Sequence, residues 1–275
     1  MVQDAFAQKK EHILQEISSS ESDLSPKGSI DEPCIPIIEL INSHPDMVTT
    51  SSCSGRVSVF IEGNKVRDGS HKSGGKGDGG KWLFVTHESS KVNGWIEKFK
   101  DMIEFKPEEE CDLDSTVQYV LYKFEPLILH VKCRNFETAA KLFNIAMSCG
   151  FRESGVGSNN IVAMRINIKL DIPIGYKAPG DPQNVLRFFV SKRYITIIDQ
   201  LSTRKFGENA IKLRELHNRI EVAFNPAKDQ PSVPQPQTES KEARRERKRN
   251  AGLLRQKALL EAQEAANELH ENAQL

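Results

Sequence analysis

Apolar side chains recur every three to four residues in five parts of the chain, which is the spacing that gives a helix one apolar face. The clearest case covers 135–149, where Phe136, Leu142 and Met147 belong to an apolar stripe and Gly150 is the expected C-cap. This pattern predicts helices over 5–17, 34–41 (a short helix or turn), 93–105, 135–149 and 190–224, the last as one long helix or two shorter ones.

Runs of β-branched and aromatic residues predict strands between these helices. Trp82 and Phe84 are two residues apart in one run, so they are expected to share a face of their strand. Glu125-Pro126 interrupts another run and divides it into two strands. The expected strands cover 48–50, 57–61, 81–87, 117–124, 127–131 and 161–168.

Composition separates the chain into regions. Apolar residues make up 38% of the 275 residues, a low share for a globular protein, so part of the chain is expected to lie outside a core. We predict a main domain over 1–225 that contains a flexible Gly-rich hairpin connection at 63–80. A Pro-rich linker over 226–238 and a charged helical or disordered tail over 239–275 are expected to follow.

Charge leaves the class of partner open. Lys plus Arg equals Asp plus Glu, at 38 each, but a neutral total does not exclude a nucleic-acid partner, because clustering on one face is what matters. The basic run ARRERKRN near the start of the tail fits a solvated helix, a localisation signal or a phosphate-binding segment.

Apolar runs are too short for a membrane span, which needs about 18 residues, and the N-terminus has no signal-peptide pattern. We therefore expect no membrane partner and a cytoplasmic protein. The five cysteines are odd in number and contain no Cys-x-x-Cys pair, which argues against a disulfide framework and against a zinc site.

The turn SSCSGR at 51–56 is the most informative segment for chemistry. Small side chains let a ligand approach the backbone, while amide groups, serine hydroxyls and the Arg56 fork can bind carboxylate or phosphate oxygens. The same residues also fit an ordinary tight hairpin. Cys53 is either a residue lining a pocket or, in a hydrolase, a nucleophile.

Other candidates lie at strand ends and in a second turn. His87 and His130 each end a strand and can act as a base at neutral pH or as structural histidines. Trp82 can stack on a purine or belong to the core, and Glu125 can hold a ribose or orient a histidine. The turn GFRESG at 150–155 combines small and basic residues, which suits a phosphate; its residues of interest are Arg152, Ser154 and Gly155.

The Gly-rich insert does not contain a known nucleotide-binding signature. GGKGDGGK lacks the strand before and the helix after that a Rossmann fingerprint requires, and it does not match a P-loop. The turns at 51–56 and 150–155 each follow a predicted helix and precede a strand, which raises the possibility of an internal duplication.

Five segments in this order resemble one family, the tRNA wybutosine-synthesising methyltransferases, which are the third enzyme of wybutosine synthesis in eukaryotes and have archaeal relatives. The resemblance extends from about residue 5 to 225 and excludes 63–80 and the tail. The segments are DLSPKGSIDE (23–32), TTSSCSGR (49–56), KWLFVTH (81–87), FEPLILHV (124–131) and GFRESGV (150–156).

The resemblance implies methyl transfer from S-adenosylmethionine to the N-4 ring nitrogen of a 4-demethylwyosine-type base in phenylalanine tRNA. It also implies an α+β fold, with a mixed sheet flanked by helices, in place of the Rossmann-like methyltransferase fold. A non-catalytic RNA-binding module is the alternative from another class.

Roles follow from the matched segments as hypotheses, with no metal ligand among them. The expected catalytic residues are His87 and His130. The expected cofactor-binding residues are Ser52, Cys53, Ser54, Gly55, Trp82, Glu125, Pro126, Ser154 and Gly155. The expected substrate-binding residues are Arg56, Arg152 and Asp31.

Overall fold

A computed structural model describes residues 4–18, 28–63, 80–107, 117–177, 185–224 and 249–250. The chain forms two units, 1–226 and 227–275, and in the second only 249–250 are described, as helical residues. The linker predicted at 226–238, nearly all of the charged tail and nearly all of the Gly-rich insert lie outside the described residues. The fold of the first unit follows.

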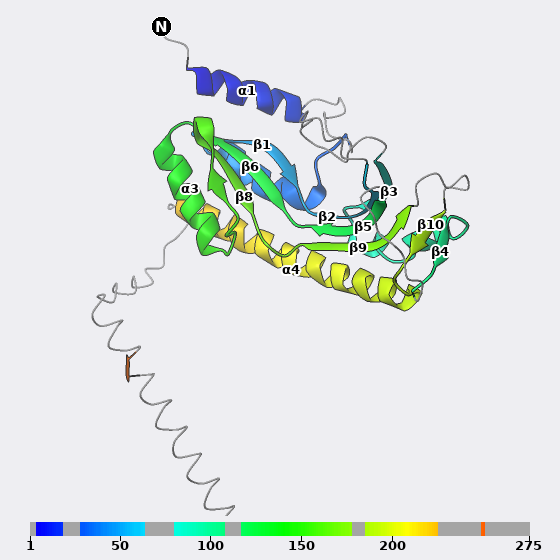
Figure 1. Cartoon of the computed structure of the whole chain (residues 1–275). Helices are drawn as coiled ribbons and strands as arrows, with labels where there is room; N and C mark the ends of the chain where they lie inside the picture. Colours follow the sequence, from blue (N-terminus) through cyan, green and yellow to red (C-terminus); the bar gives the residue numbers. More distant parts are fainter. Residues whose placement is uncertain are drawn as a thin grey trace, which may run out of the picture. The chain divides into compact units, whose positions relative to one another are not determined.

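Ten strands in the described residues form two sheets (Figure 1). Neighbouring strands are antiparallel, except that β10 and β4 are parallel. The four-stranded sheet has the order β1 (Met47–Cys53), β6 (Ile128–Cys133), β8 (Ile161–Arg165) and β7 (Gly155–Val156). The six-stranded sheet has the order β3 (Lys81–Thr86), β2 (Arg56–Ile61), β5 (Gln118–Glu125), β9 (Leu170–Lys177), β10 (Leu186–Phe188) and β4 (Ile103–Phe105).

Three stretches of backbone pass directly from one sheet into the other. β1 continues into β2 after a break at 54–55, β5 into β6 after a break at 126–127, and β8 into β9 after a break at 166–169. The first break contains Gly55, whose φ of +104° does not fit a strand, and the second contains Pro126, which has no N–H to donate to a ladder.

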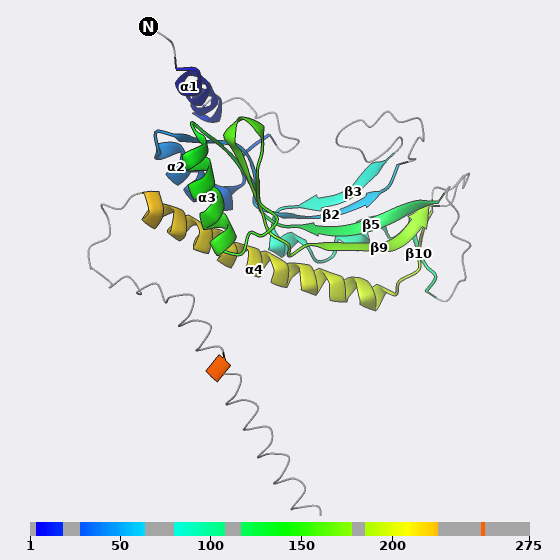
Figure 2. The same cartoon turned by 60° about the vertical axis from the view of Figure 1, so that its left-hand side comes forward.

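Three helices, α2 (Ile35–Ser43), α3 (Phe136–Ser148) and α4 (Lys192–Phe224), lie on one side of these sheets (Figure 1 and Figure 2). α4 runs beneath strands of both sheets, while α2 and α3 pack against the four-stranded sheet (Figure 2). α1 (Ala5–Ser18) lies beside β1. The other helical segments are short 3-10 helices: η1 (Glu32–Cys34), η2 (Ser89–Lys91), η3 (Trp95–Phe99) and η4 (Ser158–Asn160).

Most predicted elements are confirmed. The helices expected at 5–17, 34–41 and 135–149 are present, Asn135 caps α3, and 190–224 forms one helix. β2 and β3 pair as the expected hairpin, and the break at Glu125-Pro126 is present. The α+β class with a mixed sheet and flanking helices is also confirmed.

Four predictions about local structure are wrong. The segment 93–105 holds the short 3-10 helix η3, which begins after Gly94, and the strand β4 instead of one α-helix. The strand expected over 161–168 ends at Arg165, and β9 and β10 were not predicted.

The third error concerns Trp82 and Phe84. A register shift opposite Val59 and Phe60 places them on different faces of β3. Phe84 therefore stacks on buried Trp95, with ring centroids 5.9 Å apart, whereas Trp82 contacts Phe60 at 5.2 Å.

The fourth error concerns the turns at 51–56 and 150–155, which are not equivalent. The first is the end of β1, a break and the start of β2, and these strands belong to different sheets, so it is not a hairpin turn. The second connects α3 to the short strand β7. These segments therefore do not support the internal duplication.

Candidate functional site

The breaks at 54–55 and 126–127 lie side by side. The register pairs Arg56 with Glu125 in one sheet and Cys53 with Ile128 in the other, so both strands change sheet at the same level. A Cβ atom on Gly55 would lie 3.1 Å from the carbonyl oxygen of Glu125, so the two backbones are in close contact. The sequence segments SSCSGR and FEP are thus brought together.

Asp31 ties the first break to the segment before η1. Its Oδ2 accepts a hydrogen bond of 2.7 Å from the backbone N–H of Ser54, and the residue is only 5% exposed. The same oxygen lies 4.0 Å from Nε2 of His87, at the end of β3. Asp31, Cys53 and His87 each place a polar atom within 4.8 Å of the other two.

Cys53 is a protonated thiol in this cluster. Burial is the main cause that raises its pKa, and the carboxylate of Asp31 raises it further. A thiol is a poor nucleophile, since attack needs the thiolate. The three side chains are of types that bind Zn²⁺, and one oxygen of Asp31 already accepts the hydrogen bond from Ser54. The alternative in which Cys53 is the nucleophile of a hydrolase therefore loses its support.

Arg56, Glu125 and Trp82 meet where β2 begins, directly after the first break. Nε of Arg56 is 2.5 Å from Oε2 of Glu125, and its guanidinium lies 5.6 Å from the centre of the Trp82 ring. Strand alternation puts Arg56 and Glu125 on the face of the six-stranded sheet opposite Val57 and Phe124, which are buried in the core. The three residues form an amphipathic, partly exposed group.

His130 belongs to the four-stranded sheet and has a different environment from His87. It lies opposite Ser51, whose hydroxyl is 3.0 Å from its Nδ1. Burial, followed by the charge of Arg165, lowers the pKa of His130, so the ring is neutral at pH 7. Ser52 points to the other face, opposite buried Leu129.

Three buried polar atoms around the breaks lack a hydrogen-bond partner within the described ranges: Ser54 Oγ, Ser58 Oγ and His130 Nε2. Buried polar atoms are normally paired, so these atoms need a partner that the described residues do not supply. Ser58 was not among the residues singled out from the sequence.

The second small-residue turn is not part of this cluster. Gly155 lies in β7, the edge strand, so β8 and β6 separate it from β1. Ser154 Oγ accepts a hydrogen bond of 3.1 Å from the N–H of Arg165, and Arg152 is exposed. The roles in cofactor and substrate binding expected for Arg152, Ser154 and Gly155 therefore gain no support from closeness to the breaks.

Asn209 of α4 is a functional candidate that sequence reasoning missed. Its Nδ2 donates to the carbonyl oxygen of Ser54 at 2.6 Å, and its Oδ1 accepts from the N–H of Leu127 at 2.8 Å. The sequence pattern could have indicated this residue. Asn209 continues the apolar stripe that includes Leu213 and Leu216, and a polar residue on a buried stripe needs a buried hydrogen-bond partner.

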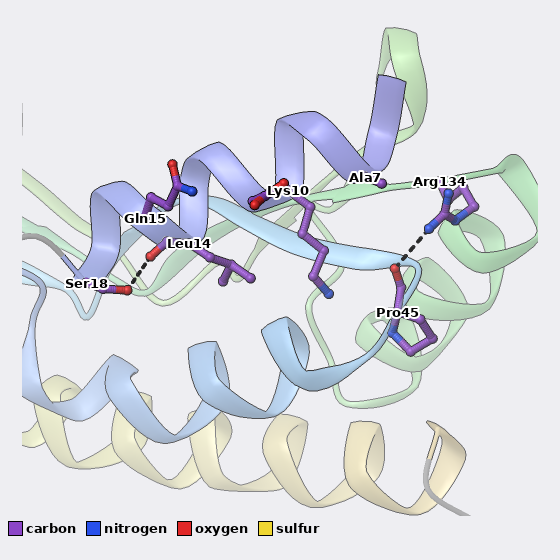
Figure 3. Close-up of a pocket in the computed structure, with 8 residues that line it drawn as sticks. Ala7, Lys10, Leu14, Gln15, Ser18, Pro45 and Arg134 are labelled. Atoms are coloured by element: carbon purple, nitrogen blue, oxygen red, sulfur yellow. Dashed lines mark hydrogen bonds between the residues drawn. The ribbon is translucent and has the colours of Figure 1, made fainter. Parts of the chain in front are cut away.

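A surface hollow of about 660 Å³ lies elsewhere, along α1 (Figure 3). Its two cations already hold the helix in place: Lys10 donates to the carbonyls of His44 and Met47, and Arg134 pairs with Asp46 and Asp4. None of the site residues expected from the sequence lines it.

Comparison with known proteins identifies the family. The family model described as Methyltransferase TYW3 matches residues 8–222. The chain belongs to this methyltransferase family. The TYW3 match begins in α1 and ends in α4, so it includes both breaks, Asp31, His87 and Asn209.

Relatives of the TYW3 family are similar over most of the chain. The tRNA wybutosine-synthesizing protein 3 of Saccharomyces cerevisiae is 55% identical over 94% of this chain and 96% of that protein. The protein of the same name from Schizosaccharomyces pombe is 40% identical over 78% of this chain and 86% of that protein. These names place the family in tRNA wybutosine biosynthesis.

The fold is shared with a solved archaeal structure. PH1069 from Pyrococcus horikoshii OT3 has a TM-score of 0.58 and 26% identity, over 81% of this chain and 96% of that one. Both the family match and this likeness agree with a methyltransferase outside the Rossmann-like class. None of the described helices has the length and apolar character of a membrane span.

Proposed function

We propose that this protein transfers a methyl group from S-adenosylmethionine to N-4 of a 4-demethylwyosine-type base in phenylalanine tRNA. Membership of the TYW3 family and the names of its relatives support methyl transfer in wybutosine biosynthesis. The observation that carries the proposal for this location is the contact between the two strand breaks, at which Asp31, Cys53 and His87 also converge.

The residues at the breaks fit the methyl donor. S-adenosylmethionine supplies an electrophilic methyl group on a sulfonium and carries a carboxylate, an amine and ribose hydroxyls. The hydroxyl of Ser54, which has no hydrogen-bond partner among the described residues, can donate to a carboxylate oxygen that reaches it, and Glu125 can accept from ribose hydroxyls. Trp82 offers a flat apolar surface next to Arg56.

His87 is the group we assign to take up a proton from the acceptor nitrogen, if that nitrogen is protonated at the start. An imidazolium formed there would lie 4.0 Å from the buried carboxylate of Asp31, which stabilises the positive charge. His130 is suited to hydrogen bonding as a neutral ring, because its pKa is lowered. Enclosure and alignment of the two reactants supply the rest of the acceleration.

The test uses tRNA from cells that lack this protein, with isotope-labelled S-adenosylmethionine and nucleoside mass analysis. We expect one labelled methyl group on the wyosine precursor of phenylalanine tRNA. We also expect S-adenosylmethionine to bind without RNA, with a Kd on the order of micromolar, at the low end of the usual range of enzyme KM values. Binding of tRNA without binding of the cofactor would support the RNA-binding module instead.

Replacement of His87 tests its role within the same assay. His87→Ala should lower kcat by about 100-fold or more, the usual contribution of a general base. His12→Ala, which changes an exposed histidine on α1, is the matched control and should leave kcat unchanged. A normal kcat in His87→Ala would remove this residue from the mechanism.

A further inference from the structure

We propose that Asn209 is a positioning residue of the methyl-transfer site, which fixes the two strand breaks at the spacing that cofactor binding requires. The proposal rests on the function proposed above and adds a residue from α4 to the site. Asn209 is 3% exposed, and its side chain binds the backbone of both breaks.

The breaks leave backbone groups without ladder partners, and Asn209 binds two of these groups. Where β1 and β5 leave their sheets, ladder hydrogen bonds are interrupted, and buried backbone groups without partners cost free energy. Asn209 supplies both missing partners from one side chain: a donor for the Ser54 carbonyl at 2.6 Å and an acceptor for the Leu127 N–H at 2.8 Å. It therefore adds a side-chain link between the two strands at the level where ladder pairing is interrupted, between the pairs Arg56–Glu125 and Cys53–Ile128.

The Ser54 residue is held from two directions. Its N–H binds Asp31 and its carbonyl binds Asn209, so the backbone just before Gly55 is fixed on both sides. Asp31 is also the neighbour of His87. A shift of Ser54 is thus expected to move both the hydroxyl assigned to the cofactor and the carboxylate that faces the assigned base.

Only an amide of this length meets the geometry. Aspartate has the same size and retains the acceptor, but an ionised carboxylate cannot donate to Ser54. Leucine has a similar volume and offers neither group. Space around the amide is limited, because a Cβ at Gly55 would lie 3.2 Å from Nδ2 of Asn209.

The test compares Asn209→Asp and Asn209→Leu with Ser202→Ala in the full chain. Ser202 is a suitable control, because it is a buried residue of the same helix and its hydroxyl contacts Tyr122 at 3.0 Å, away from the breaks. For each variant we would measure the Kd for S-adenosylmethionine, the Kd for tRNA, kcat and the free energy of unfolding.

Both Asn209 variants should weaken binding of S-adenosylmethionine by roughly tenfold or more, while the Kd for tRNA changes less than about twofold. Ser202→Ala should lose stability and keep the cofactor Kd of the native protein. The aspartate variant preserves size and the Leu127 bond, so it is the variant to examine if the leucine variant does not fold.

Native cofactor affinity in folded Asn209 variants would overturn the positioning role. Failure of both variants to fold would also overturn it, because Asn209 would then be a purely structural residue. If the native protein itself neither binds the cofactor nor methylates tRNA, the proposed function fails first, and this result is recognised before any variant is compared.

Discussion

Gly55 is the residue at which the first strand break depends most directly on the absence of a side chain. It combines a φ of +104° with a position 3.1 Å from the Glu125 carbonyl oxygen, measured from an ideal Cβ. Gly94 also has a positive φ, +79°, but a Cβ there would meet no atom within 4 Å. Substitution of Gly94 therefore tests backbone strain alone, whereas substitution of Gly55 tests backbone strain and crowding together.

We expect Gly94→Ala to cost about 1 kcal/mol of stability, from the backbone conformation alone. Gly55→Ala should cost more, roughly 2–3 kcal/mol, and should also abolish cofactor binding, because the backbones at the two breaks must move apart. Urea unfolding and calorimetric titration with S-adenosylmethionine check both values. Equal effects of the two substitutions would show that crowding at Gly55 is unimportant.

Sequence reasoning reached the residues of the breaks and Asp31, which binds Ser54, but not Asn209, which binds both breaks. Ser54, Gly55 and Glu125 lie in segments whose small or polar composition is unusual for a strand. Asn209 is more than 80 residues away from either break, and only the fold shows which buried groups it meets. Arg152, Ser154 and Gly155 had a similar local composition to the first turn, but strand order places Gly155 at the far edge of the sheet.

At the scale of elements, α4 carries three polar residues on its buried face: Asp199, Ser202 and Asn209. Besides Asn209, Asp199 lies in the core and accepts hydrogen bonds from Tyr122 at 3.0 Å and Trp95 at 3.2 Å. Burial raises the pKa of Asp199 to about 6, against the ordinary value of 3.8, and the two donors only partly oppose this.

This raised pKa predicts a change in stability with pH. Below pH 4 the carboxyl is neutral in both states; between pH 4 and 6 the unfolded chain ionises while the folded chain holds its proton. The folded state therefore loses up to about 3 kcal/mol as pH rises through this window, and the loss persists above it.

Asp199→Asn should remove this dependence. The difference in the free energy of unfolding between this variant and the native protein, from urea curves, should increase in favour of the variant between pH 4 and pH 7. Replacement of the exposed Asp101 by asparagine is the control and should give a constant difference. A constant difference for Asp199→Asn as well would mean that Asp199 ionises normally in the fold.

β9 was missed because its local sequence does not favour a strand. β9 contains Asp171, Pro173 and Gly175, residue types that are depleted in strands, yet it pairs with β5 along most of its length. Long-range pairing overrides local preference here. By contrast, α3 has its cap, its apolar stripe and its terminal glycine within one local segment, and it was predicted closely.

At the scale of the whole molecule, the two units lead to a prediction for the tail. The family match ends at residue 222, and the residues assigned to the site all lie before it. Deletion of 226–275 should therefore leave kcat at saturating tRNA unchanged. Because the deleted part contains ARRERKRN, we expect weaker tRNA binding. The steepness of log Kd against log salt concentration should fall by roughly 1 for each phosphate that the tail neutralises in the full-length protein.

Binding measurements over a range of salt concentrations, with full-length and truncated protein, check this prediction. An unchanged slope would show that the basic run does not bind tRNA phosphates. A loss of kcat at saturating tRNA would show that the tail contributes to catalysis, contrary to the assignment of 1–225 as the methyltransferase domain.

The passage of three backbone stretches from one sheet to the other limits how the protein can move. Two lobes joined by a single linker can open like a hinge, but here a parting of the sheets would have to stretch three connections at once. On the proposed function, the tRNA base would therefore reach the strand breaks without any separation of the sheets. Thermal unfolding of 1–226 should accordingly proceed in a single transition, with no stage at which one sheet survives alone.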